Sequence, residues 1–136
     1  SLLYSKIPNR QVIKMTTVNV VSLSYIIEKY QNQLHNECND VLVHYLKIDT
    51  QGKDINVVLS AKQYLKQIIL IELETALDKD NLLYIDQTDV QHDIKVMTDL
   101  GFILICVCKF DGSPLPEGGM MFINSKYEYL LKDIKL

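Results

Sequence analysis

The sequence predicts an α+β fold that is mainly helical: a three-helix core with a small antiparallel sheet and a β-hairpin wing, the element order of a winged helix. Three observations favour it. Apolar residues recur at helical spacing, two segments begin with a capping-box pattern, and the last third alternates as strand, loop and strand. The chain has 136 residues, enough for one domain with its own core. We expect an N-terminal extension over residues 1–19, with a short strand at "RQVIKM", and the winged-helix domain over residues 20–136.

The first two thirds of the chain are expected to hold three helical stretches and one strand. A helix is indicated by apolar residues at steps of three and four, namely Val20, Leu23, Ile27, Tyr30 and Leu34. A second helical stretch is predicted over residues 41–46 and ends before a turn at Gly52, and the β-branched run at 55–59 is typical of a strand. Ser60-Ala61-Lys62-Gln63 matches a capping box, which predicts a further helix that runs to about Leu77.

The last third begins with a second capping box, Thr88-Asp89-Val90-Gln91, which predicts the recognition helix. Gly101 ends this helix, and "FILICVCKF" follows as a strand. Strict alternation places Cys106 and Cys108 on the face of Phe102, which we interpret as core. A redox pair normally has two intervening residues, and a zinc site needs more ligands nearby. The loop "DGSPLPEGG", the strand "MMFIN" and a closing helix at "KYEYLLKDI" complete the order.

The charge distribution argues against nucleic acid as a direct partner. The net charge is −3, and the segment from 72 to 99 sets eight acids against two lysines, Lys79 and Lys95. The acids are Glu72, Glu74, Asp78, Asp80, Asp86, Asp89, Asp93 and Asp99. The predicted wing carries no Lys or Arg. The alternative is a DNA-binding winged helix that uses its basic N-terminal segment, Lys6, Arg10 and Lys14.

No motif of an enzyme, a cofactor or a metal site is found. The chain lacks G-x-S-x-G, the P-loop, G-x-G-x-x-G and H-E-x-x-H. We therefore predict no catalytic, cofactor-binding or metal-binding residues. Three scattered cysteines form no disulfide framework and suit a reducing compartment. No apolar run approaches the ~18 residues that a membrane span needs, so no membrane partner is expected.

A surplus of apolar positions points to a protein partner. The predicted helix over residues 60–77 carries a second stripe of Leu70, Leu73 and Leu77, and the first helix carries Val18, Val21 and Tyr25. These six residues are the candidate interface, and a homodimer is the expected assembly. The alternative, that other parts of the same chain cover both stripes, stays open.

The segment "LLYIDQTDVQHDIKVMTDLGFILICV", residues 82–107, together with the ending after the predicted wing, resembles a known family. The family is the C-terminal winged-helix domain of yeast silent information regulators related to the large subunit of the origin recognition complex. In the origin-recognition and replication-licensing ATPases, a comparable capped helix ending in Leu-Gly leads into the wing strand. The resemblance implies a homodimerisation module of a nuclear heterochromatin protein. Its role would be transcriptional silencing, with other silencing or chromatin proteins as further partners.

Overall fold

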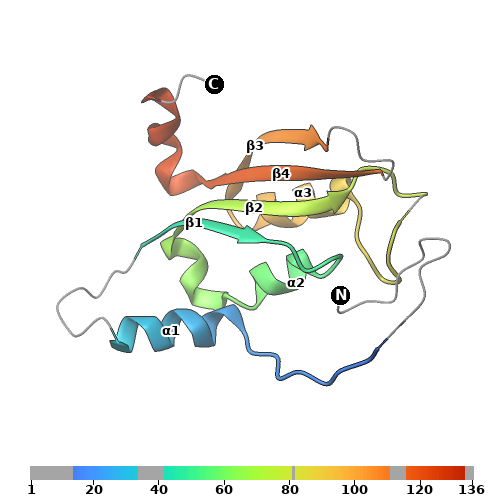
Figure 1. Cartoon of the computed structure of the whole chain (residues 1–136). Coiled ribbons are helices and arrows are strands. Elements are labelled where there is room, and N and C mark those ends of the chain that lie inside the picture. Colours follow the sequence, from blue (N-terminus) through green and yellow to red (C-terminus); the bar gives the residue numbers. More distant parts are fainter. Residues whose placement is uncertain (1–13, 34–41, 81, 111–115, 134–136) are drawn as a thin grey trace.

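The computed structural model describes residues 14–33, 42–80, 82–110 and 116–133. Within these residues the chain forms a four-stranded mixed sheet in the order β1-β2-β4-β3, with helices packed against it (Figure 1). The elements are α1 (Leu23–Gln33), β1 (Val43–Ile48), α2 (Asp54–Leu59), the 3-10 helix η1 (Lys62–Gln67), β2 (Ile68–Ala76), α3 (Val90–Asp99), β3 (Phe102–Lys109), β4 (Glu117–Asn124) and the 3-10 helix η2 (Ser125–Asp133).

The sheet combines one parallel pair with an antiparallel half. Strands β1 and β2 are parallel, and α2 and η1 form the crossover between them. Strand β4 pairs antiparallel with both β2 and β3. The carboxyl ends of β1 and β2 consequently lie at the same end of the sheet, where the loops that follow them meet.

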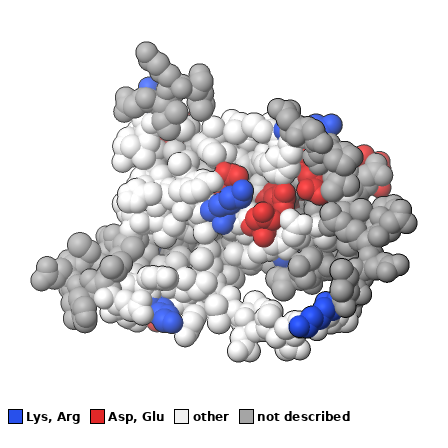
Figure 2. All heavy atoms as spheres, viewed as in Figure 1, with Lys and Arg blue, Asp and Glu red and all other residues white. Residues whose placement is uncertain are grey.

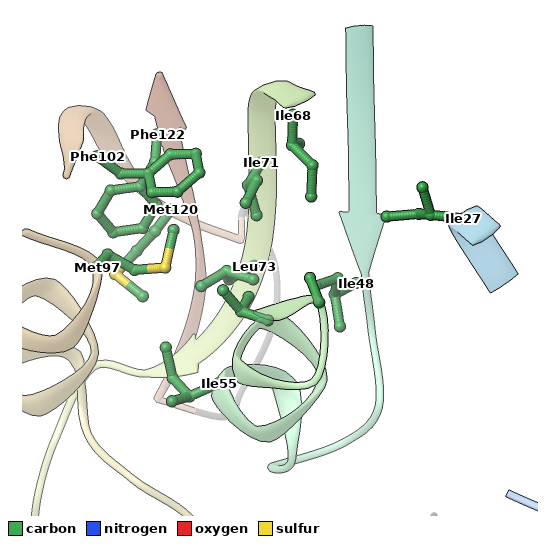
Figure 3. Close-up of a cluster of buried hydrophobic side chains, with 12 residues drawn as sticks. Ile27, Ile48, Ile55, Ile68, Ile71, Leu73, Met97, Phe102, Met120 and Phe122 are labelled. Atoms are coloured by element: carbon green, nitrogen blue, oxygen red, sulfur yellow. The ribbon is translucent and has the colours of Figure 1, made fainter. Parts of the chain in front are cut away.

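The main core lies on the face of the sheet that packs against α1, α2 and α3 (Figure 3). Strand side chains from all four strands meet Ile27 of α1, Ile55 of α2 and Met97 of α3. The strand residues of this cluster are Ile48, Ile68, Ile71, Leu73, Phe102, Met120 and Phe122. Burial of these large apolar side chains is the principal source of stability in a domain of this size.

A second, smaller cluster lies on the opposite face of the sheet, which we call the open face. There Tyr127 of η2 packs with Ile69 and Ile123, and partly buried leucines and isoleucines surround them. Helix η2 covers only one end of the open face. Beyond it, a row of directly paired residues crosses all four strands, namely Lys47, Glu72, Met121 and Cys106. Directly opposite residues on paired strands share a face, so these four side chains are neighbours.

The predicted winged helix is wrong, because the chain folds around a mixed sheet with no three-helix winged-helix core. Two segments that were predicted as helices form strands, at least in part, and the segment that was predicted as a strand forms a helix. Residues 43–48 form β1 rather than a helix, and residues 54–59 form α2 rather than a strand. The predicted long helix over residues 60–77 is instead η1 followed by β2, and Ser60 caps the end of α2.

The prediction for the recognition helix is confirmed as a helix, though not in a winged-helix setting. Asp89 rather than Thr88 caps α3, since its carboxylate accepts hydrogen bonds from the backbone N–H groups of Gln91 and His92 at 2.9 Å. Gly101 follows with a φ of 86°, as a helix C-terminus often requires. The β3–β4 hairpin is also confirmed.

The first and last predicted helices are confirmed in part. The first begins at Leu23, and the closing helix is the 3-10 helix η2. Residues 14–22 belong to no helix or strand, and most of the predicted strand "RQVIKM" lies outside the described residues, as do residues 111–115 of the predicted loop. Among the described residues, none of the helices is both long and apolar enough to cross a membrane.

Candidate interaction surface

The first predicted apolar stripe, Leu70, Leu73 and Leu77, does not form one surface. Leu70 and Leu73 lie on β2, where side chains three positions apart point to opposite faces. Leu73 is 1% exposed in the main core, whereas Leu70 packs with the cluster under η2. Leu77 packs over Gly118, where a Cβ atom would lie 3.0 Å from a Leu77 methyl carbon. The stripe disappears together with the predicted helix, and other parts of the same chain cover it.

The second predicted stripe, Val18, Val21 and Tyr25, lies on the surface. These side chains are 60%, 53% and 54% exposed. Leu23 and Ile27 of α1 pack into the main core, so the neighbouring positions of that helix must face outward. Val18 and Val21 come from the segment that leads into α1.

Two serines hold the start of α1 in place. The Ser22 hydroxyl accepts a hydrogen bond from the backbone N–H of Tyr25 at 3.2 Å, as an N-cap does. The backbone N–H of Leu23 donates to the Ser60 hydroxyl at 2.9 Å, and that of Ser24 donates to the Ser60 carbonyl at 3.2 Å. The end of α2 thus anchors the beginning of α1, and the exposed side of α1 has a defined orientation.

Exposed apolar side chains are concentrated in this part of the molecule. Of the fourteen large hydrophobic side chains that are exposed among the described residues, seven lie between positions 15 and 30. We call them the apolar strip: Met15, Val18, Val20, Val21, Tyr25, Ile26 and Tyr30. No charged residue occurs from position 15 to 27. Figure 2 shows the corresponding lower edge of the molecule as almost entirely uncharged, with basic atoms near its two ends.

A polar network occupies the carboxyl ends of β1 and β2. The buried Asp54 carboxylate accepts hydrogen bonds from the backbone N–H and hydroxyl of Thr50 and from the backbone N–H of Glu74. It thereby ties the loop after β1 to strand β2. Burial raises the pKa of Asp54, and the hydrogen bonds from Thr50 and Glu74 offset part of that increase.

Glu74 belongs to a second part of this network. The Gln51 side-chain amide donates to both Asp49 and Glu74 at 2.8 Å, and the Gln51 carbonyl accepts from the Tyr84 hydroxyl. Burial, followed by the hydrogen bond with Asp49, raises the pKa of Glu74 to about 7. The pKa of Asp49 is lowered by its hydrogen bonds with Gln51 and Glu74. Of the two carboxyl groups, Glu74 therefore keeps its proton to the higher pH, and the bridging Gln51 side chain joins the two strand ends.

Glu74→Gln is expected to stabilise the protein above pH 7. The pKa of Glu74 is raised from 4.5 to about 7 in the folded protein. The stability that comes with the bound proton is therefore fully present below about pH 4.5 and is lost as the pH rises through 7. Glutamine cannot lose a proton there. Because the carboxyl is partly exposed, solvent screening limits the gain at pH 8 to about 1 kcal/mol. Thermal unfolding of both proteins at several pH values measures it, and an equal difference at pH 4 and pH 8 would contradict the assignment.

Cys106 and Cys108 are exposed, so the prediction that they fill the core is wrong. The reason is a β-bulge: the β3–β4 register shifts between Leu104 and Cys106, which inserts Ile105 as an extra residue. Leu104 pairs with Phe122 and Cys106 with Met121, which are consecutive on β4 and point to opposite faces. The bulge consequently moves both thiols from the core face to the open face.

Comparison of the chain with models of protein families, with curated proteins and with solved structures finds no match. Among the described residues, no three histidine, cysteine or carboxylate side chains are placed to hold a metal ion together. Every buried side-chain nitrogen or oxygen atom in the described part of the chain has a hydrogen-bond partner. Its buried carboxylates are thus accounted for by structural contacts, and the apolar strip holds half of its exposed large hydrophobic side chains.

Proposed function

We propose that this chain is a non-catalytic protein-interaction domain that forms a homodimer through the apolar strip. The observation that supports this proposal is the concentration of exposed apolar side chains between residues 15 and 30, uninterrupted by charge from 15 to 27. Apolar surface exposed to water is unfavourable, and covering it is the dominant driving force of protein association. Ile27 and Ser60 anchor α1 to the rest of the domain. The part of the apolar strip that lies on α1 therefore has a defined orientation.

A second copy is the partner that the charge pattern favours. In a two-fold symmetric dimer the same patch meets itself, so a charged residue near its centre would face a like charge. Residues 15–27 contain no such residue. An acidic or basic partner would find no complementary charge in the strip, whereas an identical copy finds matching apolar surface. The net charge of −3 adds only weak repulsion between two chains.

Tyr25→Asp is expected to convert the dimer into a monomer. Removing a central apolar anchor costs more than about 2 kcal/mol, which raises the dissociation constant about 30-fold. The symmetric partner would bring a second aspartate to the same place, and the two would repel each other. Sedimentation equilibrium of the wild type, Tyr25→Asp and Val21→Asp measures the effect.

Tyr129→Asp is the matched control for this experiment. Tyr129 lies on η2 and is 60% exposed, close to the 54% of Tyr25, but it is not part of the apolar strip. The Tyr129→Asp substitution should therefore leave the dissociation constant of the dimer unchanged. Circular dichroism establishes that each variant is folded. A folded wild type that stays monomeric at high micromolar concentration rejects the proposal, and a dimer that tolerates both strip variants places the interface elsewhere.

A role in transcriptional silencing, other chromatin proteins as partners and a nuclear location stay predictions. They were implied by the resemblance to a winged-helix family, and the chain does not have that fold. The homodimer proposal stands without them. DNA binding through the basic N-terminal segment also stays a prediction, since Lys6 and Arg10 lie outside the described residues and only Lys14 is placed.

A further inference from the structure

We infer that Cys106, Cys108 and Met121 form a binding site for a monovalent soft metal ion, Cu(I), on the open face of the sheet. The two cysteines come from β3 and the methionine from the neighbouring strand β4. Thiolate and thioether sulfur atoms are the ligands that select Cu(I) in proteins. This site goes beyond the proposed homodimer and lies on different elements from the apolar strip.

The β-bulge brings the three sulfur atoms to one face. Cys106 and Cys108 are two positions apart on β3, so their side chains point the same way. Cys106 is paired directly with Met121, and directly paired residues have Cβ atoms about 5 Å apart. Strict alternation without the bulge would turn both thiols toward the core. Bulges commonly re-aim side chains at functional positions.

The thiols are close to each other and open to solvent. The Cys106 thiol lies close enough to the Cys108 side chain and to the backbone of Met121 to interact with both. Both cysteines are free and exposed. A metal ion held by two sulfur ligands at about 2.3 Å each keeps them roughly 4 Å apart, a separation that neighbouring thiols can reach. A disulfide is less suited, since residues two apart on a strand place their Cα atoms about 6.6 Å apart, near the upper limit for a bridge.

The β4 neighbour of Cys108 has no side chain that could cover the thiol. Cys108 is paired with Gly119, which has no side chain, and the nearest atom to a Cβ built at Gly119 is a ring carbon of Phe110 at 3.5 Å. Strand β4 thus places no side chain beside Cys108, and the Phe110 ring packs over Gly119 and borders this position. Glu72, the neighbour of Met121 on β2, is paired with Lys47 at 3.6 Å and accepts a hydrogen bond from Tyr45.

The ligand set favours Cu(I) over zinc. Structural zinc sites use four ligands from cysteine, histidine or carboxylates, and no group of three such residues is placed for a metal ion in the described part of the chain. Cu(I) is satisfied by about two or three soft sulfur ligands. On binding, each thiol releases its proton to solvent and donates a sulfur lone pair to the metal, so no oxidant or reductant takes part in the binding step.

Anaerobic titration of the full chain with Cu(I), with bicinchoninate as the competing chelator, tests the inference. The wild type is expected to retain one ion per chain, and Cys106→Ser and Cys108→Ser are expected to lose it. Met121→Leu, which keeps the side-chain volume, should weaken binding. Cys38→Ser is the matched control and should bind as the wild type does. Circular dichroism checks that every variant is folded.

Three results would overturn the inference. The first is undiminished Cu(I) binding by both cysteine variants, which would place the ligands elsewhere. The second is Zn(II) bound by the same cysteines as tightly as Cu(I), which would contradict the choice of metal. The third is half an ion per chain together with a copper-dependent dimer, which would mean that two chains share the metal.

Discussion

Leu73→Ala is expected to lower the free energy of unfolding by about 3 kcal/mol, whereas Leu70→Ala should lower it by only about 1 kcal/mol. Leu73 is 1% exposed in the main core, and its truncation loses apolar burial and leaves a cavity. Leu70 points to the open face, where it is only partly buried under η2. Urea or guanidinium unfolding of the two variants measures the difference.

This pair of variants also tests the strand itself. If residues 60–77 formed one helix, Leu70 and Leu73 would lie on the same side and their truncations would cost similar amounts. On β2 they point to opposite faces, so the costs should differ by about 2 kcal/mol. Equal destabilisation by both substitutions would therefore contradict the mixed sheet.

Asp93→Ala is expected to lower the free energy of unfolding by about 2–4 kcal/mol. Asp93 of α3 is 3% exposed, and its carboxylate accepts hydrogen bonds from the hydroxyls of Thr75 at 2.8 Å and Thr88 at 2.6 Å. The substitution leaves the buried Thr75 hydroxyl without its acceptor and opens a cavity between α3 and β2. Chemical denaturation measures the loss.

Asp93→Asn is the control for this prediction. Asparagine keeps the size and can hydrogen-bond with both threonine hydroxyls. Burial raises the pKa of Asp93, which means that the ionised carboxylate is costly there, so its loss removes an unfavourable contribution as well. We expect a change below about 1 kcal/mol. If asparagine is as damaging as alanine, the negative charge itself holds α3 on the sheet.

Local signals predicted the elements whose ends they mark. Asp89 caps α3 through its own side chain, and Gly101 ends the helix with a positive φ, so this helix follows from a few neighbouring residues. The β3–β4 hairpin likewise follows from two apolar runs around a loop rich in Gly and Pro. Of the candidate interface, Val18, Val21 and Tyr25 were selected from sequence as a second apolar stripe, and all three are exposed.

The run from Ile68 to Ala76 shows where sequence patterns were ambiguous. Its leucines and glutamates favour a helix by propensity, whereas the alternation of Ile71, Glu72, Leu73 and Glu74 has the period of a strand. Pairing with β1 on one side and β4 on the other decides in favour of the strand. Those partners are distant in sequence, and β propensity depends on such neighbours. The short α2 was also predicted wrongly. Its β-branched run at 55–59 favours a strand by propensity, but the segment forms a helix within the crossover between β1 and β2.

Sequence alone was sufficient for the properties that depend on composition and near neighbours: the charge balance, the uncharged stretch from 15 to 27, the capped α3 and the final hairpin. Tertiary structure decided everything that depends on which strands meet. It placed Leu73 in the core and Leu70 on the opposite face, and it moved Cys106 and Cys108 to the open face through the bulge opposite Met121. The physical reason is that strand pairing and register are set by hydrogen bonds and packing between segments distant in sequence, and a shift of one residue reverses the face of every side chain that follows.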